Sequence, residues 1–342
     1  MTRKKAKVGI LTAGGDCPGI NAAIRAVGKT AMFHYGMNVT GIINGFYGLI
    51  EKETQPLNEQ VLSGILTLGG TILGTSRIKP FKNEDGDDPL IKPEQIKKNY
   101  EELELDALIC IGGNGSQRTA ELLSQYGLNI VSIPKTIDND IWGTDVTFGF
   151  DTAVFVATEA IDRLHTTANS HKRVMVIEVM GHQAGWIALY SGIAGGGDVI
   201  LVPEIPYDKE EIANCLIERS RKKKPYSIVV VAEGIEKSSK KPAGLYIAKK
   251  IRKMTGLETR ETTLGYIQRG GSPTSYDRTL ATRFGTYAAQ LVAERQFGRM
   301  VALRNGIITS IPLNEVSGRL KLIKNDNELV EKARNMGIFF GS

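Results

Sequence analysis

Two carboxylates stand two residues apart in the segment Pro134–Asp140, which reads PKTIDND. Lys135 and Thr136 come just before this pair, Asp138 and Asp140. Such a pair can divide the work of a phosphoryl transfer, one carboxylate accepting a proton from a hydroxyl while the other holds Mg²⁺. The same residues also fit an Asx-type turn with solvated acids, in which Lys135 simply pairs with Asp138. Without its neighbours, this stretch favours the turn.

Two glycine-rich turns each precede a segment with helical spacing. One, AGGDCPG, covers Ala13–Gly19, and the other, IGGNGS, covers Ile111–Ser116. Glycines let a backbone approach a phosphate, and the N-terminus of the next helix adds free N–H groups and a favourable dipole. Either turn alone could be an ordinary tight turn, with Ser116 as a helix cap, and neither matches GxGxxG or GxxxxGK[ST]. Two of them in one chain favour phosphate binding.

Three further turns carry polar side chains. Met180–Trp186 reads MGHQAGW, Glu233 closes an apolar run, and Glu258–Arg260 precedes LGYIQRGGSP at Leu264–Pro273. Arginines beside glycines are typical partners of sugar phosphates, because a guanidinium forms forked bonds to them. Each arginine could instead form a surface salt bridge, and a lone histidine such as His182 is more often structural than catalytic.

Short apolar runs stand before these turns and are the elements that must position them. Apolar and polar residues do not alternate along these runs, which suits strands buried on both faces of a parallel sheet. Ligands bind beyond the carboxyl ends of such strands, and the alternation of strands with amphipathic segments predicts an α/β fold with parallel sheets. The expected strands are Val8–Leu11, Ala107–Ile111, Ile130–Ile133, Val174–Val179, Val199–Val202 and Ile228–Val231. The clearest helices are Asn21–Met32, Gln117–Tyr126, Ala153–Thr167, Lys209–Lys222 and Ala243–Met254.

Length and charge narrow the class of protein. The 342 residues exceed one ordinary core, which indicates two lobes or one large α/β unit, and 42% are apolar. The net charge of +6 could suit nucleic acid, a membrane surface or anionic metabolites. The dense basic run Arg219–Lys224 contains no aromatic residue and indicates a solvated helix end. Arginines beside glycine turns favour small phosphorylated ligands over nucleic acid.

Cysteine usage and the N-terminal residues favour a reducing cytoplasm. Cys17, Cys110 and Cys215 are widely spaced and include no CxxC pair, so neither a disulfide framework nor a zinc site is indicated. The initial MTRKKAK leads at once into a strand-like run and lacks the apolar segment of a signal peptide. No apolar stretch approaches the roughly 20 residues that span a bilayer.

Taken in order, these stretches resemble the phosphofructokinase family from about Lys7 to about Arg304. The segments GGDCPGINAAIR, LGGTILGTSR, IGGNGS, PKTIDND, EVMG, VVAEG and IQRGGSP follow the family's order, and PKTIDND and IQRGGSP are highly specific. The resemblance implies a 6-phosphofructokinase of glycolysis, which phosphorylates fructose 6-phosphate at its 1-hydroxyl with Mg²⁺. It also implies an active site in the cleft between two lobes. The donor lobe would comprise 1–149 and about 268–315, and the sugar-phosphate lobe 150–267 and a C-terminal helix of about 316–342.

The resemblance also implies a role for each site residue. Asp138 matches the catalytic base, Asp140 and Asn114 match Mg²⁺ ligands, and Lys135, Thr136 and His182 match the transfer site. The nucleotide-phosphate positions are Gly15, Arg77, Ile78, Gly113, Asn114, Gly115 and Ser116. The sugar-phosphate positions are Thr136, Asp138, Arg173, Met180, Gly181, His182, Glu233, Arg260, Tyr266 and Arg269.

Family members are typically homotetramers, and the resemblance implies shared active sites, with Arg173 and Arg260 reaching into a neighbour's site. The family divides into ATP and pyrophosphate users. Gly115 leaves room for the α-phosphate of ATP, where pyrophosphate enzymes typically have Asp, whereas Lys135 is typical of pyrophosphate enzymes. We expect ATP, because a steric block can exclude it while a lysine can serve either donor.

Three residues depart from the family's common pattern. Asn114 replaces an Asp and should weaken a Mg²⁺ ligand, His182 replaces an Arg, and Tyr266 replaces a His. Asn114 and His182 motivate an alternative of another class, a non-catalytic regulatory paralogue. IQRGGSP and the arginine set argue against a lipid or NAD kinase, and nothing excludes sedoheptulose 7-phosphate as an acceptor.

Weak control by effectors is also expected. Arg25, Lys222 and Lys224 keep the basic character of the family's effector site, but Glu59 and His165 stand where arginines are expected. A carboxylate among effector phosphates would repel them. We therefore predict weak or absent control by nucleoside diphosphate or phosphoenolpyruvate.

Overall fold

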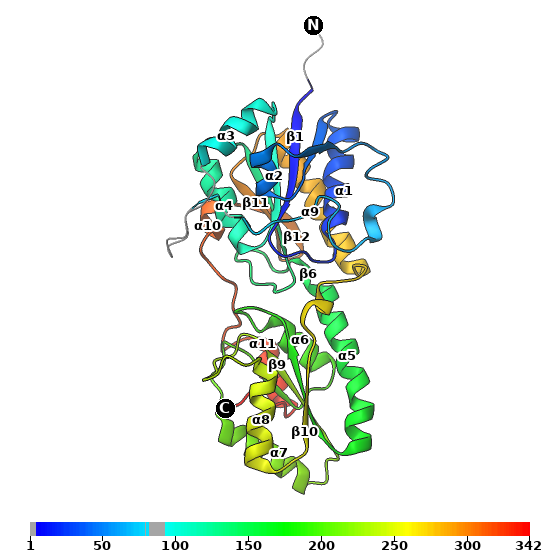
Figure 1. The fold of residues 1–342 in the computed structure, drawn as a ribbon, viewed down its shortest axis with the longest axis vertical. Helices are drawn as coiled ribbons and strands as arrows, with labels where there is room; N and C mark the ends of the chain where they lie inside the picture. The colour runs from blue at the N-terminus through cyan, green and yellow to red at the C-terminus, as the bar shows by residue number, and fades with distance from the viewer. Residues whose placement is uncertain (1–4, 79, 82–92) are drawn as a thin grey trace. The chain divides into compact units, whose positions relative to one another are not determined.

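The computed structural model describes residues 5–78, 80–81 and 93–342, which form two compact units. Unit 1 comprises Met1–Thr136, Ile141–Gly149 and Arg269–Leu320. Unit 2 comprises Ile137–Asp140, Phe150–Gln268 and Lys321–Ser342. Both units are therefore built from segments that lie far apart in the sequence (Figure 1).

Unit 1 contains a mostly parallel sheet with its longest strands in the centre. The order is β12-β11-β5-β4-β1-β2-β3, with β6 paired to β5, and only the β2–β3 and β11–β12 pairs are antiparallel. Strand β4 is buried along its whole length, as its continuous apolar run requires, and β5 is buried up to its last residue. The strands are β1 (Lys7–Ala13), β2 (Asn38–Ile42), β3 (Thr54–Pro56), β4 (Ala107–Gly112), β5 (Ile130–Thr136), β6 (Phe148–Gly149), β11 (Arg299–Arg304) and β12 (Ile307–Pro312).

The longest helix of unit 1 packs on the first one. Helices α1 (Ile20–Lys29) and α9 (Ser275–Ala293) lie side by side in Figure 1, although more than half the chain separates them. A β-carbon at Gly285 of α9 would lie 2.7 Å from Ala23 O and 2.8 Å from Ala26 Cβ, so this close approach needs glycine. The other helices are α2 (Phe46–Glu51), α3 (Pro93–Glu102), α4 (Asn114–Gln125) and α10 (Leu313–Val316).

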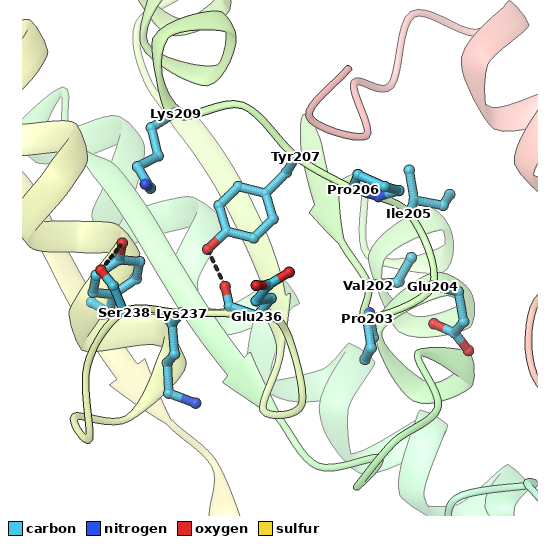
Figure 2. A pocket seen from close by; sticks show the side chains of 11 residues that line it. Val202, Pro203, Glu204, Ile205, Pro206, Tyr207, Lys209, Glu236, Lys237 and Ser238 are labelled. Atoms are coloured by element: carbon cyan, nitrogen blue, oxygen red, sulfur yellow. Dashed lines mark hydrogen bonds between the residues drawn. The ribbon is translucent and has the colours of Figure 1, made fainter.

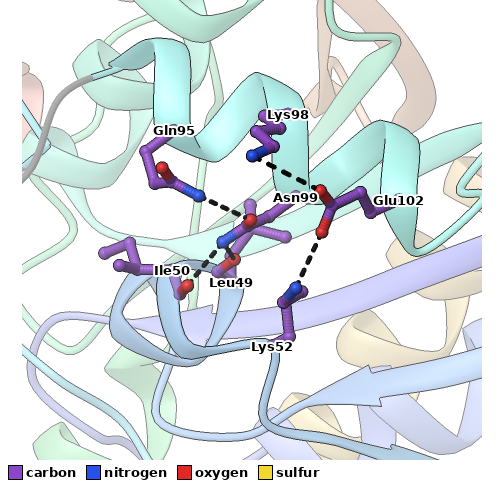
Figure 3. Close-up of polar contacts among 7 residues, drawn as sticks. All are labelled: Leu49, Ile50, Lys52, Gln95, Lys98, Asn99 and Glu102. Atoms are coloured by element: carbon purple, nitrogen blue, oxygen red, sulfur yellow. Dashed lines mark hydrogen bonds and ion pairs between the residues drawn. The ribbon is translucent and has the colours of Figure 1, made fainter.

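A buried amide joins α2 to α3 (Figure 3). Asn99 of α3 donates through Nδ2 to Leu49 O at 3.1 Å and Ile50 O at 2.5 Å, and its Oδ1 accepts from Gln95 at 2.8 Å. These bonds satisfy carbonyls at the end of α2, which the helix itself leaves open. The exposed pair Lys52–Glu102 (2.7 Å) lies beside them.

Unit 2 contains a four-stranded parallel sheet in the order β10-β7-β9-β8. Its strands are β7 (Val174–Val179), β8 (Val199–Leu201), β9 (Ser227–Ala232) and β10 (Thr259–Thr263). Helix α5 packs against α6, and α7 packs against α8. The helices are α5 (Phe150–His171), α6 (Trp186–Ala194), α7 (Lys209–Arg221), α8 (Ala243–Thr255) and α11 (Glu328–Asn335).

The predicted α/β class with parallel sheets is confirmed, and all six predicted strands are present, although β8 ends at Leu201. The predicted helices are present with shifted ends. Helix α1 ends at Lys29 and is followed by a π-helical turn over Thr30–His34. Helix α5 extends beyond both ends of the predicted helix. The helix expected at about 316–342 was too long, because that segment holds only α11, of eight residues. Within the described part of the chain, no helix is long and apolar enough to cross a membrane.

Candidate active site

The first glycine turn of unit 1 lies against an arginine and a lysine from distant segments. Gly14 has φ +83°, and its N–H donates to Ser76 O at 3.0 Å. A β-carbon at Gly15 would lie 2.6 Å from Arg269 Nη1, so only glycine lets this guanidinium approach. Lys135 Nζ donates a hydrogen bond to Gly15 O. Three of the predicted site residues, Gly15, Lys135 and Arg269, therefore meet in one place.

The predicted residues Arg77 and Ile78 follow a segment that is bonded to the same turn. Thr75 Oγ1 donates to Gly14 O at 2.6 Å, and Thr12 Oγ1 donates to Gly74 O at 2.5 Å. Arg77 and Ile78 are exposed beyond these bonds. Residue 79, which comes next, lies outside the described residues.

The second glycine turn lies beside the first, because β4 pairs with β1 and Ala13 stands opposite Gly112. Helix α4 begins at Asn114, so Asn114, Gly115 and Ser116 form its first turn, after Gly113. The N–H groups of a first turn have no partner within the helix and can bind an anion. A β-carbon at Gly115 would meet nothing within 4 Å. The space in front of this helix end is therefore open on the side of Gly115.

Sequence reasoning missed a buried glutamine that holds this turn. Gln117 Nε2 donates to Gly112 O at 2.8 Å, and Ser132 of β5 donates to Gln117 Oε1. Gln117 is fully buried. Nothing in the sequence distinguishes it from an exposed polar residue of a helix.

The PKTIDND segment begins as strand β5 of unit 1 and continues as a loop of unit 2. Lys135 is only 3% exposed, and Thr136 O accepts from Thr147 Oγ1 at 2.8 Å. After the strand, Asn139 and Asp140 are buried and Asp138 is half-buried. Backbone geometry therefore changes from a rigid strand to a loop just before the carboxylates.

The two predicted metal ligands lie in different units, Asn114 in unit 1 and Asp140 in unit 2. Both offer hard oxygen donors, which Mg²⁺ prefers. Among the described residues, no group of three or more His, Cys, Asp or Glu could hold a metal ion. Magnesium commonly uses one or two carboxylates together with substrate phosphates, so the donor type of each residue, taken by itself, suits such an ion.

A second cluster forms at the carboxyl ends of β7 and β9 in unit 2. These strands pair, with Val179 opposite Ala232, so the turns after them are neighbours. Glu233 Oε1 accepts from Gly181 N at 3.2 Å and from His182 N at 2.9 Å. Gly181 has φ +149° and His182 has φ +52°. Backbone bonds thus hold the carboxylate of Glu233 in place before any ligand arrives.

The predicted residues Met180 and Tyr266 also lie at this end of the sheet. Met180 N donates to Gln268 Oε1 at 3.3 Å, and Gln268 Nε2 donates to Gly265 O at 3.1 Å. Tyr266, in the short helix Gly265–Gln268, is 72% exposed. The fully buried Gln268 was not singled out from the sequence, although it precedes Arg269 in IQRGG.

The other two predicted arginines lie at the opposite end of this sheet. Arg173 immediately precedes β7, and Arg260 is the second residue of β10. Six residues of strand, roughly 20 Å, separate the two ends of β7. The structure therefore does not bring Arg173 and Arg260 together with Glu233 within one chain.

One glutamate holds these two arginines together. Glu258 Oε1 lies 2.9 Å from Arg173 Nη2 and 2.9 Å from Arg260 Nη2. The hydrogen bond from Arg173 lowers the pKa of Glu258, with the charges of both arginines acting in the same direction. The sequence analysis included Glu258 in the stretch Glu258–Arg260 but predicted no role for it.

A pocket of about 300 Å³ also lies in unit 2 (Figure 2). It is lined by Val202–Tyr207 and Glu236–Ser238, together with Lys209 and Tyr246. Tyr207 Oη donates to Glu236 O at 2.5 Å, and burial raises the pKa of Tyr207 to about 12. None of the predicted site residues lines this pocket.

Burial makes two of the cysteines chemically inert. Cys17 of the first turn and Cys110 of β4 are fully buried, and burial raises the pKa of both thiols. A thiol with a raised pKa stays protonated and is a weak nucleophile. Neither thiol is therefore a candidate nucleophile.

Comparisons with known proteins show the family of the chain. A family model described as Phosphofructokinase matches residues 7–292. The chain is 62% identical over 335 residues to the ATP-dependent 6-phosphofructokinase 3 of Bacteroides thetaiotaomicron, covering 98% of this chain and 100% of the relative. It is 48% identical over 354 residues to the pyrophosphate–fructose 6-phosphate 1-phosphotransferase of Streptomyces coelicolor, covering 98% of this chain and 100% of that relative.

A solved structure of phosphofructokinase from Saccharomyces cerevisiae is also similar. It superposes with a TM-score of 0.82 at 32% identity and covers 91% of this chain. The chain spans 45% of the length of that yeast chain.

Proposed function

The chain belongs to the phosphofructokinase family, and from that premise we propose that it transfers the terminal phosphoryl group of ATP to the 1-hydroxyl of fructose 6-phosphate. The observation that carries this proposal is the meeting of Gly15, Lys135 and Arg269. It sets a residue of the sugar-phosphate motif IQRGGSP beside the turn predicted to bind donor phosphates.

On the donor side, unit 1 binds phosphates mainly with backbone groups. The first turn of α4, from Asn114, offers N–H groups to phosphate oxygens. Gly15 and Gly113 let the phosphates come close to the chain, while Arg77 and Ile78 bind from the neighbouring segment. Ser116 adds a hydroxyl donor.

On the acceptor side, Asp138 takes the proton of the 1-hydroxyl as that oxygen attacks phosphorus. The new O–P bond forms as the bond from phosphorus to the leaving ADP oxygen breaks, and Thr136 and Lys135 lie next to the transfer. Asp140 and Asn114 would hold Mg²⁺, which supplies neutralisation of the phosphate charge when it is bound.

The sugar phosphate is held by side chains. Glu233, which is fixed by two backbone N–H groups, accepts hydrogen bonds from sugar hydroxyls. Met180, Gly181, Tyr266 and Arg269 complete the binding surface. His182 contributes its N–H to Glu233 and its side chain to the transfer site.

Arg173 and Arg260 bind the 6-phosphate in the site of a neighbouring copy. Their separation from Glu233 along β7 supports this, because both ends of one strand cannot reach the same small ligand. The protein then works as a homo-oligomer, with a tetramer as the expected form, and a monomer has little activity.

ATP is the proposed donor because a β-carbon at Gly115 meets nothing within 4 Å. Open space at this position supports binding of a bulky α-phosphate. The bond from Lys135 to Gly15 O supports a role for this lysine in holding the turn, which is compatible with either donor.

Initial rates of fructose 1,6-bisphosphate formation with Mg²⁺ test the proposal, using ATP or pyrophosphate. We expect turnover with ATP. Turnover with pyrophosphate alone would reassign the donor. Absence of turnover with both would favour the non-catalytic paralogue, which binds sugar phosphate without converting it.

Weak effector control is part of the proposal. His165 forms hydrogen bonds to Tyr226 Oη at 2.9 Å and to Gly195 O at 2.6 Å, and Arg219 forms an ion pair with Asp198. Polar groups that bond to one another are less available to an effector phosphate. A phosphoenolpyruvate titration should therefore give little inhibition, and strong sigmoidal inhibition would contradict this.

A glycolytic role places the protein in the cytoplasm.

A further inference from the structure

The loop that carries Asp138 and Asp140 is bonded to a residue near the C-terminus. Lys321 donates its backbone N–H to Asp140 O at 2.8 Å. Its Nζ donates to Asn139 Oδ1 at 2.8 Å, across 182 positions of sequence. All of these residues belong to unit 2.

Lys321 is itself held against helix α6. Trp186 Nε1 donates to Lys321 O at 2.8 Å, and the Lys321 ammonium lies 5.7 Å from the centre of the Trp186 ring system. Two residues on, Ile323 N donates to Glu204 Oε1 at 3.1 Å, and the same carboxylate accepts from Gly185 N at 3.0 Å. The segment Lys321–Ile323 is thus bonded to Trp186, the first residue of α6, and shares the carboxylate of Glu204 with Gly185, which precedes the helix.

Asn139 needs such a partner because of its conformation and its burial. It has φ +53°, a left-handed conformation that costs free energy for residues other than glycine and is tolerated best by Asn and Asp. It is only 4% exposed, and a buried amide oxygen requires a hydrogen-bond donor. The bond from Lys321 meets this need and fixes the direction of the chain between the two carboxylates.

We propose that Lys321 is a positioning residue for the catalytic loop. It acts through the Asn139 side chain and the Asp140 backbone, and so sets where the base Asp138 stands. This inference rests on the proposed function, which assigns proton transfer to Asp138. A shift of a catalytic group by about 1 Å can reduce a rate by about a hundredfold.

Two substitutions remove the hydrogen bond between Lys321 and Asn139, one at the donor and one at the acceptor. Lys321→Met keeps an unbranched apolar stem against Trp186 and removes the donor. Asn139→Gly keeps the left-handed backbone and removes the acceptor. Lys324→Met, at an exposed lysine of the same segment, is the matched control.

Each variant of the bond should lower kcat for ATP-dependent turnover by about tenfold or more. The KM for fructose 6-phosphate should change by less than about twofold, because its proposed side-chain ligands are untouched. The double variant should fall no more than about threefold below the weaker single variant, because both changes remove one interaction. Lys324→Met should match the wild type.

The outcomes distinguish failure of the positioning role from failure of the proposed function. An active wild-type protein with both single variants at the level of Lys324→Met overturns the positioning role alone. The same holds if the two effects multiply as for independent sites. An inactive wild-type protein overturns the proposed function and this inference with it. If Lys321→Met does not fold, Lys321→Arg, which keeps a donor, should retain kcat within about threefold while Asn139→Gly does not.

Discussion

The two units present their ligand groups in different ways. In unit 1, the proposed site consists of backbone N–H groups and of glycines without a side chain. The space beside Gly115 is open, and the space beside Gly15 is taken by the guanidinium of Arg269. In unit 2, side chains form the proposed site, and hydrogen bonds from elsewhere hold them in place, as for Glu233 and Asn139. We therefore expect added side-chain atoms to impair ligand binding at the site in unit 1, and removed side-chain atoms to impair it at the site in unit 2.

A further contrast lies within unit 2. At the carboxyl end of its sheet, Glu233 is held by neighbours in its own chain. At the amino end, Arg173 and Arg260 are held by Glu258, and our proposal assigns them to the site of another copy. Under this proposal, one sheet supports two half-sites.

The largest expected effect tests these half-sites by complementation. Asp138→Asn should lower kcat by about 10²- to 10⁴-fold, because the base is lost. Arg260→Ala should lower activity at limiting fructose 6-phosphate. Coexpressed in equal amounts, the two variants should recover about a quarter of wild-type activity, because random pairing completes that share of shared sites.

The purified single variants and the coexpressed hybrid are assayed side by side. If Arg260 served its own chain, no hybrid site would be complete. Activity equal to the sum of the two singles would therefore refute the shared site.

Gly115→Asp should come next in size. Its carboxylate would enter the open space in front of α4 and repel the α-phosphate, so kcat/KM for ATP should fall by about a hundredfold. The melting temperature should stay near that of the wild type, because the added atoms meet nothing within 4 Å of the β-carbon. Gly115→Ala is the control for bulk without charge, and unchanged ATP kinetics in the Asp variant would refute the steric argument.

Gly15→Ala should have a smaller effect on the sugar side. The new methyl would lie 2.6 Å from Arg269 Nη1 and push the guanidinium away. The KM for fructose 6-phosphate should rise by about tenfold, as expected for loss of one charge-assisted contact. Gly113→Ala, whose β-carbon would find its nearest atom at 3.5 Å, should leave that KM unchanged.

Glu258→Gln should have the smallest effect. Glutamine can still accept a hydrogen bond but lacks the charge that holds the half-buried Arg173 and the exposed Arg260, so the KM for fructose 6-phosphate should rise by about three- to fivefold. The exposed Glu261 of β10, the strand that begins just after Glu258, supplies the control, Glu261→Gln. Equal KM values for these two variants would show that Glu258 does not position the pair.

The strands and the glycine turns were predictable because their causes are local. Continuous apolar runs such as the one in β4 can only be buried on both faces, and a turn that needs φ above zero, as at Gly14, favours glycine. Helix α9 was not among the predicted helices, and four of its nine buried residues are alanine or glycine, which weakens its apolar pattern. Strands β2, β3, β11 and β12 were not predicted either. Of these, β3 and β12 are the edge strands of the sheet and are largely unburied, so they lack a continuous buried apolar run.

The types of the site residues follow from the sequence, but their partners do not. Glycine spacing, paired carboxylates and arginines beside turns depend on backbone geometry over a few residues, and these features led to the family. The bonds from Lys321 to Asn139, from Ser132 to Gln117 and from Arg173 to Glu258 join segments that only packing brings together. Packing free energy is summed over whole elements, so no short stretch encodes which distant side chain will stand beside Asn139. The separation of Arg173 from Glu233 was likewise decided by the direction of β7 in its sheet.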